Sequence, residues 1–313
     1  MRILSFNCHE ALNTMWASLC DELHLMYYND LYYWKDAHRD RPKNVFLYPK
    51  GVRPEGKFDV AVGFNEKIHW EGMQWADCPK TDSLAITYYD PKNPKDVDAR
   101  PPAQLVTDLR RRNMIYCGHM QKRRWGMEGT AGPVIYYGVD KDRWRPGPRD
   151  NGRVCVIAHD FRARDNVLDF YWCHDLLKGL PWDVIGRQKD GLPSVYPKNF
   201  DGLRDIYENY SIFFDPAHCS PLSFAVIEAM YSGMCIVTRP HDDIPRFLMN
   251  GENAIVESNS GILRSAVERL LANRAERMRL GEAARATAEK VFALDRWKRE
   301  TMGYFRKIGV RGA

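Results

Sequence analysis

Long hydrophobic runs are missing from this sequence. No apolar stretch approaches the ~18 residues that a membrane-spanning helix requires, and the first one, residues 2–6, is too short for a signal peptide. We therefore expect a soluble protein in the cytoplasm of a bacterium or of a virus-infected host cell. Hydrophobic residues make up 44% and charged residues 28% of the 313 residues, and this ordinary balance excludes bulk disorder.

Clustered metal ligands are missing as well. The eight cysteines are scattered, and no two of them form a CxxC pair, which excludes a zinc ribbon, a thioredoxin motif and a haem attachment site. We interpret them as small, buried, apolar residues. There is no HExxH motif and no clustered set of histidines and cysteines, so we predict no metal site and no permanently bound cofactor.

Acidic residues are scarce in one window of a chain whose formal net charge is only +5. Residues 101–150 hold ten basic and five acidic side chains, and 110–124 contain no acid. The basic residues of this shorter segment are Arg110, Arg111, Arg112, Lys122, Arg123 and Arg124. They indicate either a solvated helix face with its loop, or a surface for a phosphate-rich partner such as nucleic acid.

Short strand-like runs alternate with helical stretches along the whole chain. In the first half, we predict strands at 2–6, 44–48, 58–64, 84–88, 114–117 and 134–136, with helices at 10–24 and 102–111. In the second half, we predict strands at 154–158, 182–186, 211–214 and 234–238. Helices are predicted there at 166–180, 202–210, 221–232, 263–273, 274–292 and 294–308. This alternation favours an α/β protein with parallel sheets covered on both faces.

The strongest break in the pattern is 146–152, which contains two prolines, two glycines and an Asn-Gly pair. We interpret it as a linker and predict a first Rossmann-like domain at 1–147 and a second at 148–293. A helix at about 294–313 is expected to pack back on the first domain. Ligands of such sheets bind beyond the carboxyl ends of the strands, so the loops after the strands are the expected places of function.

The loop after the predicted strand at 211–214 has the composition of a phosphate-binding turn. Small and polar residues lead directly into the helix at 221–232, and the unpaired amides and positive dipole end of a helix start attract phosphate groups. Glu228 falls in the second turn of this helix, where its carboxylate suits a sugar hydroxyl. An ordinary strand–helix turn would show the same pattern.

Four motifs resemble those of GT-B glycosyltransferases, especially the retaining family four, also described as glycosyl transferases group 1. They are PLSFAVIEAMYSGMCIVT at 221–238, IP with NGENA at 244–254, YGVDKDRWRP at 137–146 and, more weakly, GEAAR at 281–285. Their order and spacing match the family over 134–292, whereas residues 1–130 match only as a generic α/β domain. The resemblance implies a GT-B fold, with two Rossmann-like domains whose parallel sheets face each other across a cleft.

This resemblance assigns roles to single residues of the second domain. It implies that Glu228 binds the ribose of a nucleotide-sugar and that backbone amides at Ser223 and Phe224 meet its diphosphate. Arg164 stands where the family has a lysine that neutralises the leaving group, and a planar guanidinium can perform that task. The rest of the predicted donor-binding set is Leu222, Ser220, Arg162, Gly186 and His159, the last at a position where the family has arginine.

Two departures from the family matter for the chemistry. Ser220 replaces the acid that the family uses on the transferred sugar, so sugar orientation rests on Asp215, His218 or backbone groups. Asp90 takes the place of the family's histidine–aspartate pair after a strand of the first domain, and we predict it to be catalytic. The alternative for Asp90 is a structural Asx turn before Pro91.

The remaining candidates lie after strands of the first domain. His9 follows the first strand directly and is predicted to act with Arg164 and Asp90 in catalysis, as a group able to move a proton. The predicted acceptor-binding residues are Glu10, His119, Arg123 and Arg124.

The resemblance implies transfer of a sugar from a UDP- or GDP-sugar to a hydroxyl acceptor, with retention of configuration and without a metal ion. The acceptor is a glycan, a protein or a hydroxymethylated pyrimidine in DNA. DNA gains weight because the basic segment without acids lies in the acceptor half of the chain, and a DNA base would have to be flipped out of the duplex to react. With DNA as the acceptor, the chain would resemble a DNA glycosyltransferase of the phage type. A nucleotide-sugar 2-epimerase and a non-catalytic GT-B module that binds nucleic acid are the alternatives.

Overall fold

The computed structural model describes residues 1–7, 9–27, 34, 39–64, 67–84 and 101–313. These residues fall into two compact units, which are described one at a time. Unit 1 holds the described residues up to Gly138 together with Leu294–Ala313, and unit 2 holds Val139–Ala293. No helix in the described ranges combines the length and the apolar character that crossing a membrane requires.

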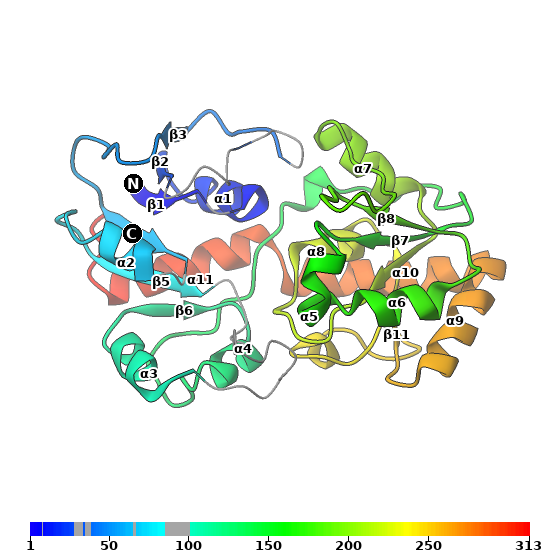
Figure 1. The fold of residues 1–313 in the computed structure, drawn as a ribbon. Coiled ribbons are helices and arrows are strands. Elements are labelled where there is room, and N and C mark those ends of the chain that lie inside the picture. Colours follow the sequence, from blue (N-terminus) through cyan, green and yellow to red (C-terminus); the bar gives the residue numbers. More distant parts are fainter. Residues whose placement is uncertain (8, 28–33, 35–38, 65–66, 85–100) are drawn as a thin grey trace. The chain divides into compact units, whose positions relative to one another are not determined.

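Unit 1 is built on a six-stranded parallel sheet with the order β3-β2-β1-β4-β5-β6. Its strands are β1 (Arg2–Phe6), β2 (Glu22–Met26), β3 (Val45–Tyr48), β4 (Val60–Gly63), β5 (Lys80–Leu84) and β6 (Met114–Tyr116). Its helices are α1 (Glu10–Ala17), α2 (Lys67–Gly72), α3 (Ala103–Arg110), α4 (His119–Arg124) and α11 (Leu294–Lys307). The strand order reverses at β1, which makes the carboxyl ends of β1 and β4 the switch point of the sheet (Figure 1).

Helix α11 closes the core of unit 1 although it comes last in the sequence. The ring of Trp297 meets that of Trp16 edge-on at 5.0 Å, and Phe305 stacks against Trp16 at 6.0 Å. Gly138 packs so closely on α11 that a Cβ there would lie 2.6 Å from Trp297 Cβ. Burying two aromatic rings is strongly favourable, and these contacts hold α11 on the core of unit 1.

The sequence interpretation of unit 1 needs three corrections. The helix predicted at 10–24 is a short helix followed by β2, because Leu23 and Leu25 are fully buried in the sheet. A strand that was not predicted, β5, covers Lys80–Leu84, and residues 85–88 of the strand predicted at 84–88 lie outside the described ranges. The segment at 134–136 contributes only a single bridge, between Val134 and Tyr116.

Unit 2 is built on a five-stranded parallel sheet with the order β11-β10-β9-β7-β8. Its strands are β7 (Val154–Ile157), β8 (Trp182–Ile185), β9 (Ile212–Asp215), β10 (Cys235–Thr238) and β11 (Ile255–Val256). Its α-helices are α5 (Asp165–Leu168), α6 (Phe170–Leu177), α7 (Phe200–Asn209), α8 (Phe224–Tyr231), α9 (Ser260–Ala272) and α10 (Arg274–Val291). Short 3-10 turns are η1 (Lys141–Arg143), η2 (Arg162–Arg164) and η3 (Ile244–Arg246).

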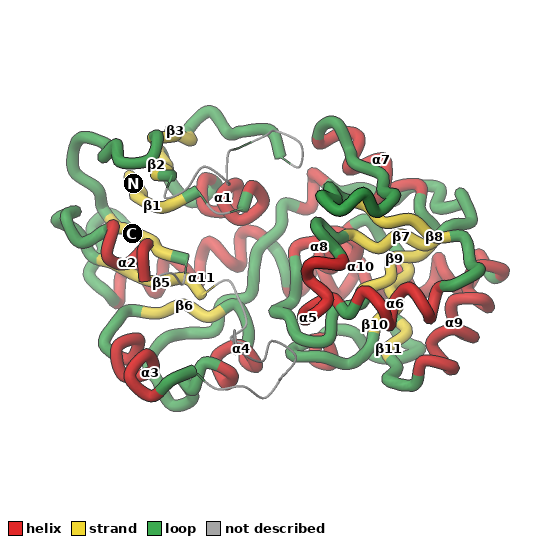
Figure 2. The backbone as a smooth tube through the Cα atoms, in the orientation of Figure 1, coloured by secondary structure: helices red, strands yellow, loops and turns green. Residues whose placement is uncertain are grey.

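Helices cover both faces of the unit 2 sheet, as Figure 2 shows with strands in yellow and helices in red. Phe214 on β9 points into the cluster formed with α6 and α9. Its neighbour Phe213 stacks with Tyr207 of α7 on the other face, with ring centroids 6.5 Å apart. The predicted α/β class with two parallel sheets is confirmed.

Two predictions for unit 2 are corrected by local backbone geometry. Residues 146–152 are not a free linker, because Arg149 is 2% exposed and donates to the Ser232 carbonyl at 2.6 Å. The helix predicted at 166–180 is broken between α5 and α6, where Asp169 takes a left-handed backbone conformation with φ 52°. Aspartate tolerates that conformation better than most residues do.

Candidate functional site

The carboxyl edge of the unit 2 sheet gathers most of the predicted donor-binding residues. Because all its strands are parallel, the loops that follow them leave the sheet at one edge, which is the ligand-binding edge of such folds. These loops begin at residues 158, 186, 216 and 239, after β7, β8, β9 and β10. The helix start at α8 follows the third of them.

Helix α8 begins as a phosphate-binding helix would. Ser223 is its N-cap, and the serine Oγ accepts a hydrogen bond from the amide of Val226 at 3.3 Å. The preceding Leu222 is buried and anchors the loop, whereas Phe224 is half-buried. Ser220 has turned its hydroxyl to the Pro221 carbonyl, to which it donates at 3.0 Å.

Glu228 lies one turn further along α8 and is only 4% exposed. The hydroxyl of Tyr207, itself fully buried on α7, donates to Glu228 Oε2 at 3.1 Å. A buried carboxylate needs such partners, because an unpaired charge in the interior is costly. The helix and the tyrosine together hold this carboxylate in one orientation.

The turn after β8 packs directly on the turn after β7. Gly186 has φ 137°, and a side chain there would clash with the carbonyl of Ala158. His159 Nδ1 accepts a hydrogen bond from the amide of Arg187 at 2.9 Å, which fixes the neutral ring as the Nε2–H tautomer. The ring of Tyr196 meets His159 edge-on at 6.1 Å.

The two predicted arginines of the β7 loop sit on turn η2 and differ in their surroundings. Arg162 lies 3.4 Å from Asp190 and 5.1 Å above the ring of Phe170. Arg164 is exposed at the surface, and its amide closes the turn by donating to the Asp160 carbonyl at 3.1 Å. Both residues are exposed, so both guanidinium groups are accessible to a ligand.

Asp215, predicted as one of the groups that could orient the sugar, belongs to a buried cluster of charges whose other members the sequence interpretation missed. His241 Nε2 lies 3.2 Å from Asp215 Oδ2, and His241 Nδ1 lies 3.9 Å from Asp242 Oδ2. Burial alone would lower the pKa of His241, but the two carboxylates outweigh it and raise that pKa to about 9. The run of a histidine and two aspartates at 241–243, in the loop after β10, was the available signal.

The predicted residues of unit 1 are more exposed. His9 is the exposed N-cap of α1, after β1, and His119 is the exposed first residue of α4, after β6. Glu10 is half-buried and accepts a hydrogen bond from the Arg39 amide at 3.1 Å. Asp90 lies outside the described residues.

The basic segment at 110–124 is not a continuous cationic surface. Arg112 forms a 2.8 Å ion pair with the fully buried Asp82. Lys122 Nζ donates to the carbonyls of Thr130 and Gly132 at 2.8 and 2.7 Å, and Arg124 is 8% exposed. Of the two arginines predicted to bind the acceptor, only Arg123 faces solvent.

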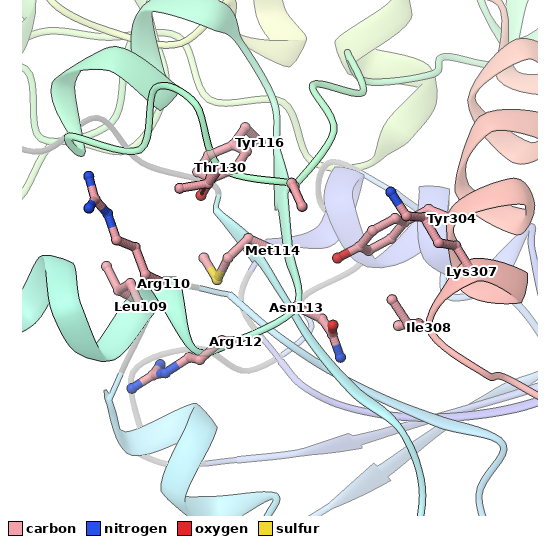
Figure 3. A pocket seen from close by; sticks show the side chains of 12 residues that line it. Leu109, Arg110, Arg112, Asn113, Met114, Tyr116, Thr130, Tyr304, Lys307 and Ile308 are labelled. Atoms are coloured by element: carbon pink, nitrogen blue, oxygen red, sulfur yellow. Dashed lines mark hydrogen bonds between the residues drawn. The ribbon is translucent and has the colours of Figure 1, made fainter.

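A cavity of about 200 Å³ lies elsewhere in unit 1, at the amino end of β6. Figure 3 shows Arg110, Asn113, Tyr304 and Lys307 around it. Because parallel sheets bind ligands at the carboxyl edge, this cavity stands apart from the predicted groups. Across the described ranges, no group of three or more histidine, cysteine or acidic side chains is placed to hold a metal ion.

Two parallel sheets with interleaved helices define the GT-B class, and solved glycosyltransferases share this architecture over nearly the whole chain. Residues 171–302 match the family model described as glycosyl transferase-like. The chain therefore has a GT-B fold, and part of its second half is similar to a glycosyl transferase-like family. A comparison with curated protein sequences finds no match.

Three solved structures illustrate the similarity. Sucrose-phosphate synthase from Thermosynechococcus elongatus is 11% identical with a TM-score of 0.73, covering 98% of this chain and 99% of that one. Anabaena HepE in complex with UDP and glucose is 11% identical with a TM-score of 0.74 and the same coverage. Trehalose-6-phosphate synthase from Burkholderia multivorans is 11% identical with a TM-score of 0.64, covering 100% and 99%. At such identities the likeness concerns the fold.

Proposed function

We propose that this chain is a glycosyltransferase that uses a UDP- or GDP-sugar bound at the carboxyl edge of unit 2. The observation that carries the proposal is Glu228, buried at 4% exposure one turn behind the start of α8 and oriented by Tyr207. A carboxylate held in this way accepts hydrogen bonds from two neighbouring ribose hydroxyls. The HepE complex with UDP and glucose, on the same fold, supports this choice of donor class.

The other donor contacts follow from the geometry of the same edge. The start of α8, capped by Ser223, offers its positive dipole end to the diphosphate. The exposed guanidinium of Arg164 and the Nε2–H of His159 supply further positive or donor groups. Such groups stabilise the charge that develops on the leaving diphosphate, which is the main electrostatic demand of the transition state.

The proposed reaction breaks the bond between the anomeric carbon and the diphosphate oxygen and forms a bond from that carbon to the acceptor oxygen. The diphosphate departs with the bonding electron pair, and the acceptor proton passes to a diphosphate oxygen. Resemblance to retaining GT-B enzymes supports attack from the same face of an oxocarbenium-like sugar, which retains the anomeric configuration. No protein nucleophile is needed for this route.

We propose that the acceptor contacts the carboxyl-edge residues of unit 1, namely His9, Glu10, His119 and Arg123, and Asp90 stays a catalytic candidate. A glycan or protein hydroxyl fits these groups better than duplex DNA does. Lys122 and Arg124, which a DNA-binding surface would use, are held by the fold or buried. Hydroxymethylated DNA therefore ranks below the other acceptors.

Incubation with UDP-, GDP- and ADP-sugars, alone and with glycan, protein and hydroxymethylated DNA acceptors, tests the proposal. We expect release of one nucleoside diphosphate and a mass increase on one acceptor. Glu228→Gln should weaken donor binding roughly 10- to 100-fold, since hydrogen bonds to a charged group contribute about 1.5–3 kcal/mol. The control is Glu268→Gln, on the surface of α9. No diphosphate release from any donor, or a nucleotide-sugar epimer as product, would contradict the proposal.

A further inference from the structure

A buried ion pair lies at the carboxyl edge of unit 2, between the loops that follow β9 and β10. Asp215 is the last residue of β9 and is paired in register with Thr238, the last residue of β10. His241 follows three residues later and brings its Nε2 to 3.2 Å from Asp215 Oδ2. The two side chains are 10% and 2% exposed, respectively.

The other charged groups around this pair are engaged with partners of their own. Arg239 donates to Asp169 at 2.9 Å and to the carbonyls that follow β9. Asp243 lies 3.3 Å from Arg246, and Asp242 flanks the far side of the imidazole at 3.9 Å. The histidine is therefore the cation that faces the Asp215 carboxylate.

Stability alone does not account for charges in this place. A buried ion pair is often no more stabilising than apolar residues of similar volume, because both charges must leave water. Perturbed ionisable groups gather at functional sites instead, and this pair stands at the ligand-binding edge of the sheet. A carboxylate held in a fixed orientation there suits recognition of hydroxyl groups.

Two other side chains at this edge, those of Ser220 and His218, are less suited than Asp215 to accepting hydrogen bonds from a sugar. Ser220, which takes the position of the family's first acid, has its hydroxyl turned to the Pro221 carbonyl at 3.0 Å. Burial and the nearby Arg239 lower the pKa of His218, so that ring is neutral at physiological pH. Asp215 has both carboxylate oxygens held, Oδ1 by the Ala217 amide at 3.3 Å and Oδ2 by the imidazole.

We propose that Asp215 accepts hydrogen bonds from hydroxyls of the donor sugar and that His241 is the positioning residue that holds its carboxylate. This inference rests on the proposed function. A carboxylate has about four acceptor positions, of which the two protein donors occupy two. The remaining positions accept two sugar hydroxyls, and the nucleotide itself gains nothing from them.

Calorimetry of the full chain separates the sugar contact from nucleotide binding. The dissociation constants of UDP, UDP-glucose, GDP and GDP-mannose are measured for wild type, and the ratio of nucleotide to nucleotide-sugar constants defines the sugar preference. Asp215→Asn and His241→Phe should each reduce that preference about tenfold or more, as expected for a contact to a charged group, with nucleotide binding retained. His241→Gln, which can still donate to Asp215, should restore part of it.

A matched control isolates the cost of breaking a buried ion pair. Asp82→Asn disrupts the pair with Arg112 in unit 1, where Asp82 is fully buried. It should lower the melting temperature and leave the sugar preference unchanged. If Asp215→Asn does not fold, the two His241 variants decide the matter.

The outcomes distinguish failure of the proposed function from failure of the Asp215 contact. If wild type binds none of the four probes, nor any other nucleotide-sugar, the proposed function fails together with this inference. If wild type binds a nucleotide but shows no sugar preference, or if the variants keep the preference, the Asp215 contact is wrong and the proposed function stands. Equal weakening of nucleotide and nucleotide-sugar by all variants would assign the pair a structural role, which also overturns the inference.

Discussion

The carboxyl edges of the two sheets carry very different side chains. In unit 2, Glu228, Asp215 and His241 are buried and tied to neighbours by hydrogen bonds. In unit 1, His9 and His119 stand exposed at the starts of short helices. A fixed, desolvated constellation suits a ligand whose shape does not vary, such as a nucleotide diphosphate, whereas exposed groups on loops adapt more readily to a changing partner.

The largest expected effect tests whether the two units can be separated. Trp297→Ala should destabilise unit 1 by about 3–5 kcal/mol, since it empties a site that is 2% exposed and packed on Trp16. Nucleotide binding should persist, because every residue of the proposed donor site belongs to unit 2. Denaturant titration with and without nucleotide measures both. Loss of nucleotide binding in step with stability would show that the donor edge depends on unit 1.

The next effect concerns Arg164 of turn η2. Arg164→Ala should lower kcat about 100-fold with little change in KM, because the leaving group gains charge only in the transition state. Arg162→Ala is the matched comparison, since Arg162 is held by Asp190 and Phe170, and we expect a smaller loss. Steady-state kinetics with the preferred donor distinguish them. A rise in KM alone for Arg164→Ala would make it a ground-state contact.

A pH titration sharpens the comparison through the buried ion pair. The carboxylates of Asp215 and Asp242 hold the pKa of His241 at about 9, above its ordinary value of 6.5. Because the pKa of His241 is higher in the folded than in the unfolded protein, its protonation adds to the free energy of unfolding. This contribution is fully present below pH 6.5 and is lost as the pH rises through 9. The unfolding free energy of wild type should therefore decline over this range, and that of His241→Gln should decline less. Parallel curves for the two proteins would contradict the assignment.

The smallest expected effect lies in the basic segment of unit 1. Arg123→Ala should change the unfolding free energy by less than about 0.5 kcal/mol, because its side chain is 56% exposed. Lys122→Ala, one residue away, should cost roughly 1–3 kcal/mol because two backbone carbonyls lose their donor. Thermal melts measure both. A drop in the salt slope of DNA binding by about 0.9 for Arg123→Ala would instead support a phosphate contact.

The unit 2 strands and α8 could be predicted from sequence because their signals are local. The strand, loop, helix and strand from Ile212 to Thr238 follow one another without interruption, so hydrophobic pattern and capping residue agree. Strand β5 at Lys80–Leu84 was not predicted, because its polar residues are buried only through contacts with residues far away in the sequence. Asp82 enters the core only beside Arg112, thirty residues later, and Gly63, which leaves room for it.

The same difference between local signals and contacts that are distant in sequence applies to the candidate site. The roles proposed for Glu228 and Ser223 follow from one contiguous motif, whereas the His241–Asp215 pair joins two loops that are 26 residues apart. The sequence around His241 does not indicate that Asp215 is its partner, and the sequence around Asp215 does not indicate His241. Their approach is set by the pairing of β9 with β10, and only tertiary structure brings it about.

The late position of α11 has a consequence for how the chain folds during synthesis. Trp16 must wait for Trp297 and Phe305 before its burial is complete, so unit 1 stays open while the ribosome makes all of Val139–Ala293. Unit 2 can collapse in that interval, since domains fold as units while the chain emerges. Until α11 arrives, the apolar surface of α1 is exposed, and this is the stage at which a chaperone would protect the nascent protein from aggregation.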